Sequence, residues 1–355
     1  MLRALKNYDN VSIVIGSANQ PRTIKNPWTA DERQNVILDW YDKELVKDST
    51  LGKLTFVYQR DWKYNNSKWF SDIHGKLQNE SDRIDLSTQQ FKHDPIWITG
   101  SKRDPSSFYL DGFPRPVFEL DLVPIDEQVS ATLSATWCRE IYLGRSFNGR
   151  RLDRFMYESL MAAVVPETTM KWLNEFEKTD AFKYLTEAYA VIQDRQREMM
   201  TKYGVAPAIC ADAVVIQSGH ILLIRRRSHP GKGLWALPGG HVDAHEFPFD
   251  AAIRELGEES KIDCPPAVIR GSLKFSQWFD HPDRSNVSRV ITHAFCFHLP
   301  DYKINGRVTL PTVRGSDDAD RARWFPIYAA RDMASELFDD HHEIIEAFVH
   351  KLGEK

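Results

Sequence analysis

Apolar and polar residues alternate in two distinct periods along the first 145 positions. Four short apolar runs have the length of buried strands and fall at residues 11–16, 54–58, 95–99 and 117–122. After the first run, Pro27 breaks the chain, and Thr29 and Glu32 have the spacing of a capping box. This predicts a helix from Thr29 to about Leu45. A second helix is predicted after the loop that follows the second strand. Strands that alternate with helices indicate a parallel α/β sheet.

The pattern changes further along the chain. Residues 146–207 are mostly helical and charged, with Pro166 placed to start a helix. From Ala208 the pattern is β-rich, and Ser218-Gly219 forms the turn of a predicted hairpin between residues 211–217 and 220–225. Further strands are predicted at residues 267–275, 290–298 and 322–325, before a final helix over residues 340–352. We therefore expect a first domain at 1–150, a helical extension and linker at 151–207, and a second domain at 208–355.

The composition argues against a nucleic-acid-binding or membrane protein. The 355 residues carry 46 basic and 50 acidic side chains, a net charge of −4, which argues against a broad nucleic-acid surface. No apolar run approaches the roughly 20 residues of a membrane span, and the N-terminus lacks the features of a signal peptide. The scattered cysteines show no metal-like spacing and are expected to be reduced thiols. We expect a cytoplasmic protein that binds neither nucleic acid nor membrane.

The stretch from Leu234 to Ile262 carries the candidate chemistry. A strand, a glycine loop and a helix are predicted there, and Glu255, Glu258 and Glu259 lie on one face of that helix. Three clustered carboxylates are best explained by a divalent cation, and hard oxygen ligands suit Mg²⁺ or Mn²⁺.

The opposite side of the same helix is apolar. Ala252, Ile253 and Leu256 are predicted to bury against a sheet, while Arg254 is placed to hold the carboxylate of Glu246. The helix therefore has one face for chemistry and one for packing.

This stretch resembles the Nudix box, Gly-x5-Glu-x7-Arg-Glu-U-x-Glu-Glu-x-Gly-U, where U is a bulky aliphatic residue. Every position matches except the second glycine, which is Lys261 here. A left-handed conformation is favoured at that position, so the lysine is expected to cost ~1 kcal/mol if its φ is positive. The resemblance implies a Nudix domain with an α/β/α-sandwich fold over residues 208–355.

The Nudix resemblance also implies roles for individual residues. The three glutamates and the carbonyl of Gly240 would bind Mg²⁺ or Mn²⁺, Glu258 or Glu259 would act as the base, and Glu246 and Arg254 would orient the helix. Arg226 is a candidate phosphate contact, with a solvated strand end as the alternative. Possible outer contributors, with structural roles as the alternative, are His281, His293, Asp317 and Asp318.

Loops in the first domain resemble those of the nucleotidyltransferases that make NAD from nicotinamide mononucleotide (NMN) and ATP. The similar segments are Asn26-Pro27-Trp28-Thr29 with Arg33, Asp61-Trp62 through Trp69, Gly100-Ser101-Lys102-Arg103-Asp104, and Ser134-Ala135-Thr136-Trp137-Cys138-Arg139. By this resemblance the substrate-binding residues would be Asn26, Trp28, Arg33, Trp69, Ser134, Thr136 and Arg139. Hydroxyls and amides at a helix start suit phosphate, arginine suits a triphosphate, and an indole suits nicotinamide.

One departure concerns the family's Gly-Arg-Phe-x-Pro-Phe-His-x-Gly-His segment, which binds ATP phosphates and does not occur here. A start codon placed too late and a loss of adenylyl transfer both explain it. The expected fold is a Rossmann-like nucleotidyltransferase domain without its first strand, followed by the Nudix domain.

Fusions of this layout are associated with hydrolysis of ADP-ribose to AMP and ribose 5-phosphate, and related Nudix hydrolases often form homodimers. The alternatives are a nucleotide-sensing regulatory protein and a Nudix hydrolase of another dinucleotide, such as NADH or diadenosine polyphosphate.

Overall fold

The structure is a computed structural model, and it describes residues 1–88, 95–100, 110, 112–113, 117–122, 135–147, 150–204, 206–304 and 307–353. Contacts divide the chain into two compact units. The first unit comprises Met1–Gln20 and Lys25–Lys183, and the second comprises Pro21–Ile24 and Tyr184–Lys355. The predicted domain limits at residues 150 and 207 stay a prediction.

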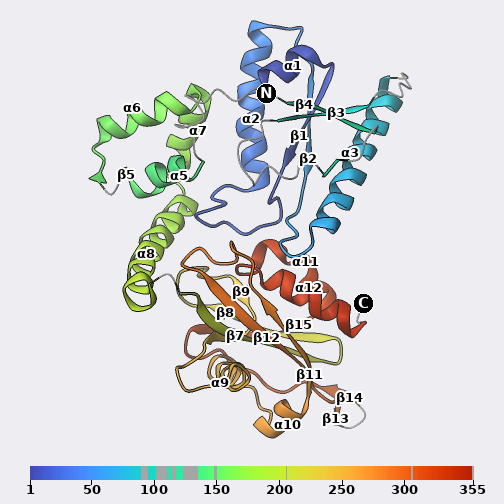
Figure 1. Cartoon of the computed structure of the whole chain (residues 1–355), viewed down its shortest axis with the longest axis vertical. Helices are drawn as coiled ribbons and strands as arrows, with labels where there is room; N and C mark the ends of the chain where they lie inside the picture. Colours follow the sequence, from blue (N-terminus) through green and yellow to red (C-terminus); the bar gives the residue numbers. More distant parts are fainter. Residues whose placement is uncertain are drawn as a thin grey trace. The chain divides into compact units, whose positions relative to one another are not determined.

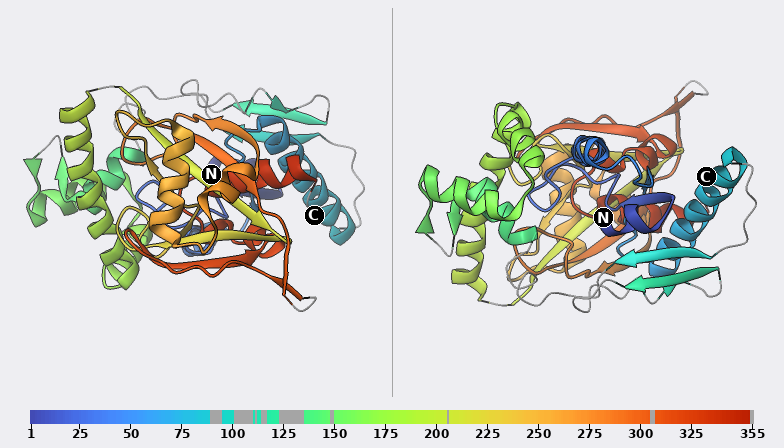
Figure 2. Two further views of the ribbon diagram at one scale, coloured as in Figure 1. Left: turned by 90° about the horizontal axis from the view of Figure 1, so that it is seen from below. Right: turned by 90° about the horizontal axis from the view of Figure 1, so that it is seen from above.

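The first unit begins with alternating helices and strands, as the sequence predicts (Figure 1). Their bounds are α1 Leu2–Asn7, β1 Asn10–Ile15, α2 Ala30–Lys47, β2 Lys53–Tyr58, α3 Asn66–Thr88, β3 Ile96–Gly100 and β4 Phe118–Leu122. Strand β1 pairs with β2, and β3 pairs with β4, both in parallel. Figure 2 shows β3 and β4, in teal, side by side next to α3. The predicted parallel α/β pairing is confirmed.

The capping box of α2 forms as predicted. The Thr29 hydroxyl accepts from the Glu32 backbone N–H at 3.2 Å, and the Glu32 carboxylate accepts from the Thr29 N–H at 2.8 Å. The helical region that follows contains α5 Ala135–Gly144, β5 Ser146–Phe147, β6 Arg150–Arg151, α6 Arg154–Val164, α7 Glu167–Phe176 and α8 Asp180–Tyr203. Pro166 is the N-cap of α7, so the sequence also locates this helix start.

The second unit is built on a seven-stranded mixed sheet with the order β11-β12-β7-β8-β15, in which β10 also pairs with β7 and β9 with β8. The strands are β7 Ala208–Gln217, β8 His220–Arg226, β9 Trp235–Ala236, β10 Gly239–His241, β11 Leu273–Phe279, β12 Val290–His298 and β15 Ala319–Pro326. The remaining elements are α9 Pro248–Ser260, α10 Pro266–Gly271, β13 Tyr302–Ile304, β14 Arg307–Thr309, α11 Ile327–Asp332, the 3-10 turn η2 Ala334–Glu336, and α12 His341–Leu352. The predicted hairpin is present: β7 and β8 are antiparallel, and Ser218 and Gly219 both have positive φ in its turn.

Helices cover both faces of this sheet (Figure 1). Alternate residues of β7, including Ala211 and Ala213, pack in one core with Ala252 and Leu256 of α9. On the other face, the Phe348 ring of α12 lies 5.1 Å from that of Phe275 and 5.8 Å from that of Phe279. The predicted α/β/α sandwich is confirmed, and the buried residues of α9 hold one side of this helix against the sheet.

One predicted strand is partly wrong. Residues 267–275 were expected to be extended, but Pro266–Gly271 is helical and the strand begins at Leu273. Two consecutive prolines explain the difference, because Pro266 suits the first turn of a helix and Pro265 is its N-cap.

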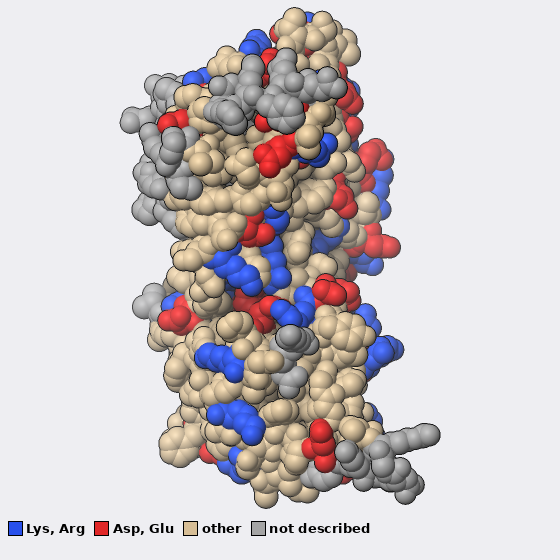
Figure 3. Space-filling view, turned by 90° about the vertical axis from the view of Figure 1, so that its right-hand side faces the viewer, with Lys and Arg blue, Asp and Glu red and all other residues tan. Residues whose placement is uncertain are grey.

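Side chains of both charge signs share one face of the molecule. On the face drawn in Figure 3, basic and acidic side chains are interspersed without an extended basic area. Among the helices that the structure describes, none is both long enough and apolar enough to span a bilayer.

Candidate functional site

Helix α9 carries the glutamate cluster on the side that faces away from its core. Pro248 occupies the first turn, which suits its fixed φ and missing N–H. The predicted apolar side is confirmed, because Ala252, Ile253 and Leu256 are all buried. Packing of these residues sets the rotation of the helix, and that rotation brings Glu255, Glu258 and Glu259 toward the strand β10.

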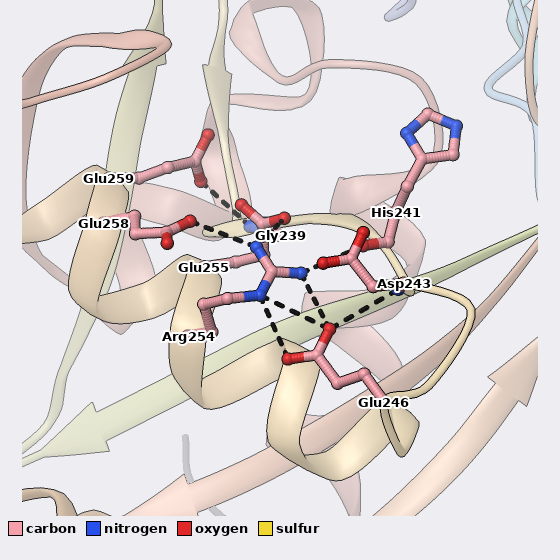
Figure 4. Close-up of polar contacts among 8 residues, drawn as sticks. All are labelled: Gly239, His241, Asp243, Glu246, Arg254, Glu255, Glu258 and Glu259. Atoms are coloured by element: carbon pink, nitrogen blue, oxygen red, sulfur yellow. Dashed lines mark hydrogen bonds and ion pairs between the residues drawn. The ribbon is translucent and has the colours of Figure 1, made fainter.

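Arg254 organises the carboxylates (Figure 4). Its Nε and Nη2 donate to the two carboxylate oxygens of Glu246 at 3.0 and 2.9 Å, and Nη2 also donates to the His241 carbonyl at 3.1 Å. Its Nη1 donates to Glu255 at 2.8 Å and to Glu258 at 3.1 Å. The hydrogen bonds from Arg254 lower the pKa of Glu246. One guanidinium therefore holds three acidic side chains in fixed orientations.

Glu259 is the most deeply placed of the three glutamates. Only 5% of its surface is exposed, and its carboxylate accepts from the Gly239 backbone N–H at 2.9 Å. Burial raises the pKa of Glu259 to about 8 against the opposing Gly239 hydrogen bond, and the charges of Glu255 and Asp212 add to the rise. Burial also raises the pKa of Glu255. Burial is therefore the main reason that both carboxyl groups hold their protons more tightly than usual.

Two adjacent glycines let strand β10 lie flat between α9 and β7. A Cβ on Gly240 would stand 2.4 Å from Glu255 Oε1, and a Cβ on Gly239 would stand 2.1 Å from Asp212 Oδ1. A Cβ on Gly239 would also stand 2.6 Å from the Ala211 carbonyl oxygen, so this position requires glycine, whereas a Cβ on Gly240 would displace the end of the Glu255 side chain. The Gly240 backbone therefore lies close to the end of the Glu255 side chain, and the role of its carbonyl as a metal ligand stays a prediction.

A buried polar network beneath β10 was not predicted. Asp212 accepts from the Thr292 hydroxyl at 2.7 Å and lies 4.0 Å from the Arg284 guanidinium. Arg284 donates to both oxygens of Asp340 at 2.9 and 3.0 Å, and His341 Nδ1 accepts from the Leu237 N–H at 2.8 Å. The network fixes the segment that leads into β10. The available signal was an aspartate inside an otherwise apolar strand.

Lys261 ends α9 in the left-handed conformation expected for the family's glycine. Its φ is 42° and its ψ is 41°, and its N–H donates to the Gly257 carbonyl at 3.1 Å. The substitution therefore leaves the helix exit in place and removes no carboxylate.

Arg226 lies close enough to the glutamate cluster for electrostatic interaction. Burial lowers the pKa of its guanidinium, while the charges of Asp339 and Glu259 act in the opposite direction. Its Nε donates to the Pro230 carbonyl at 2.9 Å, and its guanidinium lies 4.1 Å from the centre of the Phe338 ring. These contacts show that Arg226 is not a solvated side chain, and its role as a phosphate contact stays a prediction.

The outer candidates separate into two groups. The charge of Asp317 raises the pKa of Glu255, and the charge of Asp318 acts on Arg226, so both lie near the site. His281 Nδ1 instead accepts from the Asp283 N–H within its own loop. The His293 ring instead stacks on that of Trp278 on the neighbouring strand β11.

The donor set fits a hard divalent cation. Three carboxylates and a carbonyl are the ligands that Mg²⁺ and Mn²⁺ prefer. Among the described residues, no three acidic, histidine or cysteine side chains are already gathered as a finished metal site. Glu255 and Glu258 instead face Arg254, so a cation would have to draw at least one of them away from the arginine.

In the first unit, several predicted substrate contacts are used in packing. The ring of Trp28 lies 6.0 Å from that of Tyr142 and 6.2 Å from that of Trp172. Trp69 packs against a core that includes Ile73, and it also lines a cavity of about 1130 Å³ that is bordered by β1, α3 and β3. Both indoles therefore have structural contacts, and their roles in binding stay predictions.

The polar candidates of the first unit have defined partners. Arg33 donates to the carbonyls of Gly16 and Ser17 at 2.7 and 3.3 Å, which anchors the loop after β1. Arg139 donates to the Thr136 hydroxyl at 3.2 Å on α5, so this part of the predicted motif is brought together.

The other candidates are less informative. Asn26 is partly buried in the loop before α2. Ser134 and the loop from Ser101 to Asp104 lie outside the described residues.

Comparison with known proteins gives matches to both units. The NUDIX domain family matches residues 207–348. The chain is 28% identical over 186 residues to a nicotinamide/nicotinic acid mononucleotide adenylyltransferase of Acinetobacter baylyi, a match that covers 52% of this chain and 81% of that protein. It is 29% identical over 143 residues to an ADP-ribose pyrophosphatase of Methanocaldococcus jannaschii, covering 40% of this chain and 73% of that protein.

A solved structure matches nearly the whole chain. It is a bifunctional NMN adenylyltransferase/ADP ribose pyrophosphatase from Francisella tularensis in complex with AMP and a Mn ion. Its TM-score is 0.77 at 25% sequence identity, and the match covers 98% of this chain and 93% of that chain. The order of the two folds along the sequence is therefore the same in both proteins.

Proposed function

The chain belongs to the Nudix family, and we propose that its second unit hydrolyses ADP-ribose to AMP and ribose 5-phosphate with Mg²⁺ or Mn²⁺. The observation that carries this proposal is the set of three glutamates on α9, held by Arg254 and packed against β10. The similarity to ADP-ribose pyrophosphatases supports the choice of substrate.

The buried and the exposed glutamates have different roles in this proposal. Glu255 and Glu259, together with the Gly240 carbonyl, would hold a divalent cation, because they lie deepest and closest to β10. When bound, such a cation polarises a phosphoryl oxygen and lowers the pKa of a bound water.

The remaining groups act on water and phosphate. Glu258 has the most exposed carboxylate of the three, at 43%, and it accepts the proton of the attacking water at an Oε atom. Arg254 keeps that carboxylate aimed at the site through its Nη1. Arg226 binds a phosphate oxygen from the side of Glu259.

Hydrolysis of ADP-ribose, followed by separation of AMP and ribose 5-phosphate, tests the proposal. We expect turnover with Mg²⁺, none with EDTA, and loss of turnover in Glu258→Gln with the fold intact. Glu158→Gln, an exposed change on α6 in the other unit, serves as the control and should leave the rate unchanged. NADH and diadenosine polyphosphate are tested in the same assay. If either is hydrolysed faster than ADP-ribose, that compound is the preferred substrate. Nucleotide binding without any turnover would identify a sensor.

We also propose that the first unit is NMN adenylyltransferase-like and takes NMN and ATP as ligands. The support is the similarity to the adenylyltransferase of Acinetobacter baylyi and the contact between Thr136 and Arg139. The 355 residues contain no His-x-Gly-His sequence, so binding and catalysis need separate measurements. Titration calorimetry with NMN measures the first, and NAD formation from NMN and Mg-ATP measures the second.

A further inference from the structure

Strand β11 carries an aromatic pair on its outer surface. The Trp278 ring lies 4.2 Å from the ring of His293 on β12, and the two planes are 17° from parallel. Trp278 is 48% exposed even though it stacks on this neighbour. A hydrogen bond of 2.9 Å between His293 Nε2 and the Ser276 hydroxyl fixes the orientation of the imidazole ring. The pair is a rigid, flat aromatic surface that reaches solvent.

This pair is on the same face of the sheet as the catalytic helix. Phe275 and Phe279 of β11 contact Phe348 of α12, so the alternate residues Ser276 and Trp278 point to the opposite face. On β12, Phe295 is the neighbour of His293 on that face, and it packs in the core under α9.

Strand register connects the aromatic pair to the glutamate site. Gly240 pairs with Ala211, Ala211 pairs with His293, and His293 pairs with Trp278. These residues form one row across four strands. With about 4.8 Å between neighbouring strands, the backbone of Trp278 lies roughly 14 Å from that of Gly240, and its indole extends from the sheet.

We propose that the Trp278–His293 stack binds the nucleobase of the substrate, with the base lying on the free face of the indole. This rests on the proposed function, since it assumes that a nucleoside diphosphate occupies the glutamate site. An indole stacks well on a planar base. Stacking of this kind accepts any base and needs only an exposed ring in a fixed orientation. Since Trp278 is 48% exposed while it stacks on His293, part of the indole is open to a ligand.

Products that differ in the base provide the test. AMP carries the nucleobase, whereas ribose 5-phosphate has a sugar and phosphate without it. We expect calorimetry in Mg²⁺ to show that Trp278→Ala raises the Kd of AMP about 10-fold and leaves that of ribose 5-phosphate unchanged. Trp278→Phe should retain most of the affinity. Tyr328→Ala, which removes another exposed aromatic ring at 68% exposure on α11, should change neither.

Several outcomes would overturn this assignment. Equal AMP affinity in wild type and Trp278→Ala is one, and an equal loss for both products is another, since it would indicate a general structural change. A third is a variant that becomes monomeric while its AMP affinity stays the same, which would make the indole a contact between copies of the chain. Failure of the proposed function is distinguishable, because a wild-type protein that binds AMP through Trp278 but does not hydrolyse ADP-ribose would refute only the hydrolase.

Discussion

Replacing Glu259 by glutamine should stabilise the metal-free protein at alkaline pH. In the native protein the Glu259 carboxylate accepts from the Gly239 N–H at 2.9 Å. The glutamine side chain fills the same space, and its carbonyl oxygen can accept the same hydrogen bond. It cannot ionise. The variant therefore isolates the free energy that the native protein loses when it ionises a carboxyl group of which only 5% is exposed.

The magnitude follows from the pKa. Burial raises the pKa of Glu259 from an ordinary 4.5 to about 8, and each unit corresponds to about 1.4 kcal/mol. The folded state holds this proton more tightly than the unfolded state, so stability is highest below pH 4.5 and falls as the pH rises toward 8. Wild type should consequently lose on the order of 5 kcal/mol between pH 4.5 and pH 9 through this group, and the variant should not.

Urea denaturation in EDTA at pH 5, 7 and 9 measures the effect. The free energies of unfolding of wild type and Glu259→Gln should be similar at pH 5 and diverge in favour of the variant by pH 9. Adding Mg²⁺ should stabilise wild type more than the variant, because the cation loses a ligand. Glu258→Gln is the matched control on the same helix, because its carboxylate is 43% exposed. A difference between wild type and Glu259→Gln that does not vary with pH would refute the reasoning.

Three further predictions concern the same unit or its neighbour. Lys261→Gly should raise the free energy of unfolding by up to about 1 kcal/mol, because it relieves a positive φ of 42°, whereas Lys261→Ala should not; equal values for the two variants in urea denaturation would contradict this. Arg254→Lys should lower kcat for ADP-ribose by about 10- to 100-fold with a smaller change in KM, since a lysine cannot bridge Glu246, Glu255 and Glu258 at once, and near-normal turnover would show that the orientation of these carboxylates is unimportant. The 355-residue chain should form no NAD from NMN and Mg-ATP in a coupled dehydrogenase assay, because it lacks His-x-Gly-His, and measurable NAD would show that other residues perform the phosphate chemistry.

The sequence predicts the local part of the site well. Three glutamates at helical spacing, the Arg254–Glu246 pair and the left-handed position of Lys261 all follow from contacts within about 20 residues of each other. Such contacts are determined mainly by helix geometry and the loop before it. The predicted alternation of the first unit succeeded for the same reason.

Contacts between distant parts of the chain could not be predicted. Asp212 and Arg284 approach each other only after the sheet has formed, and nothing local to either residue specifies the other. Trp28 shows the same limit, because it packs on Tyr142, a residue far along the chain that its local sequence does not specify. The error at residues 267–275 had a local cause, since an apolar run does not distinguish a short helix from a strand when prolines precede it.

The contacts of Arg254 bear on whether folding of α9 needs a bound cation. Because an internal guanidinium already neutralises part of the carboxylate cluster, the helix does not depend on a bound ion to keep its acidic side chains together. If the proposed cation binds here, the fold of α9 would therefore not require it, unlike that of small domains that fold only around their ion. Loading would then be reversible in the folded state, and activity would follow the free cation concentration of the surroundings.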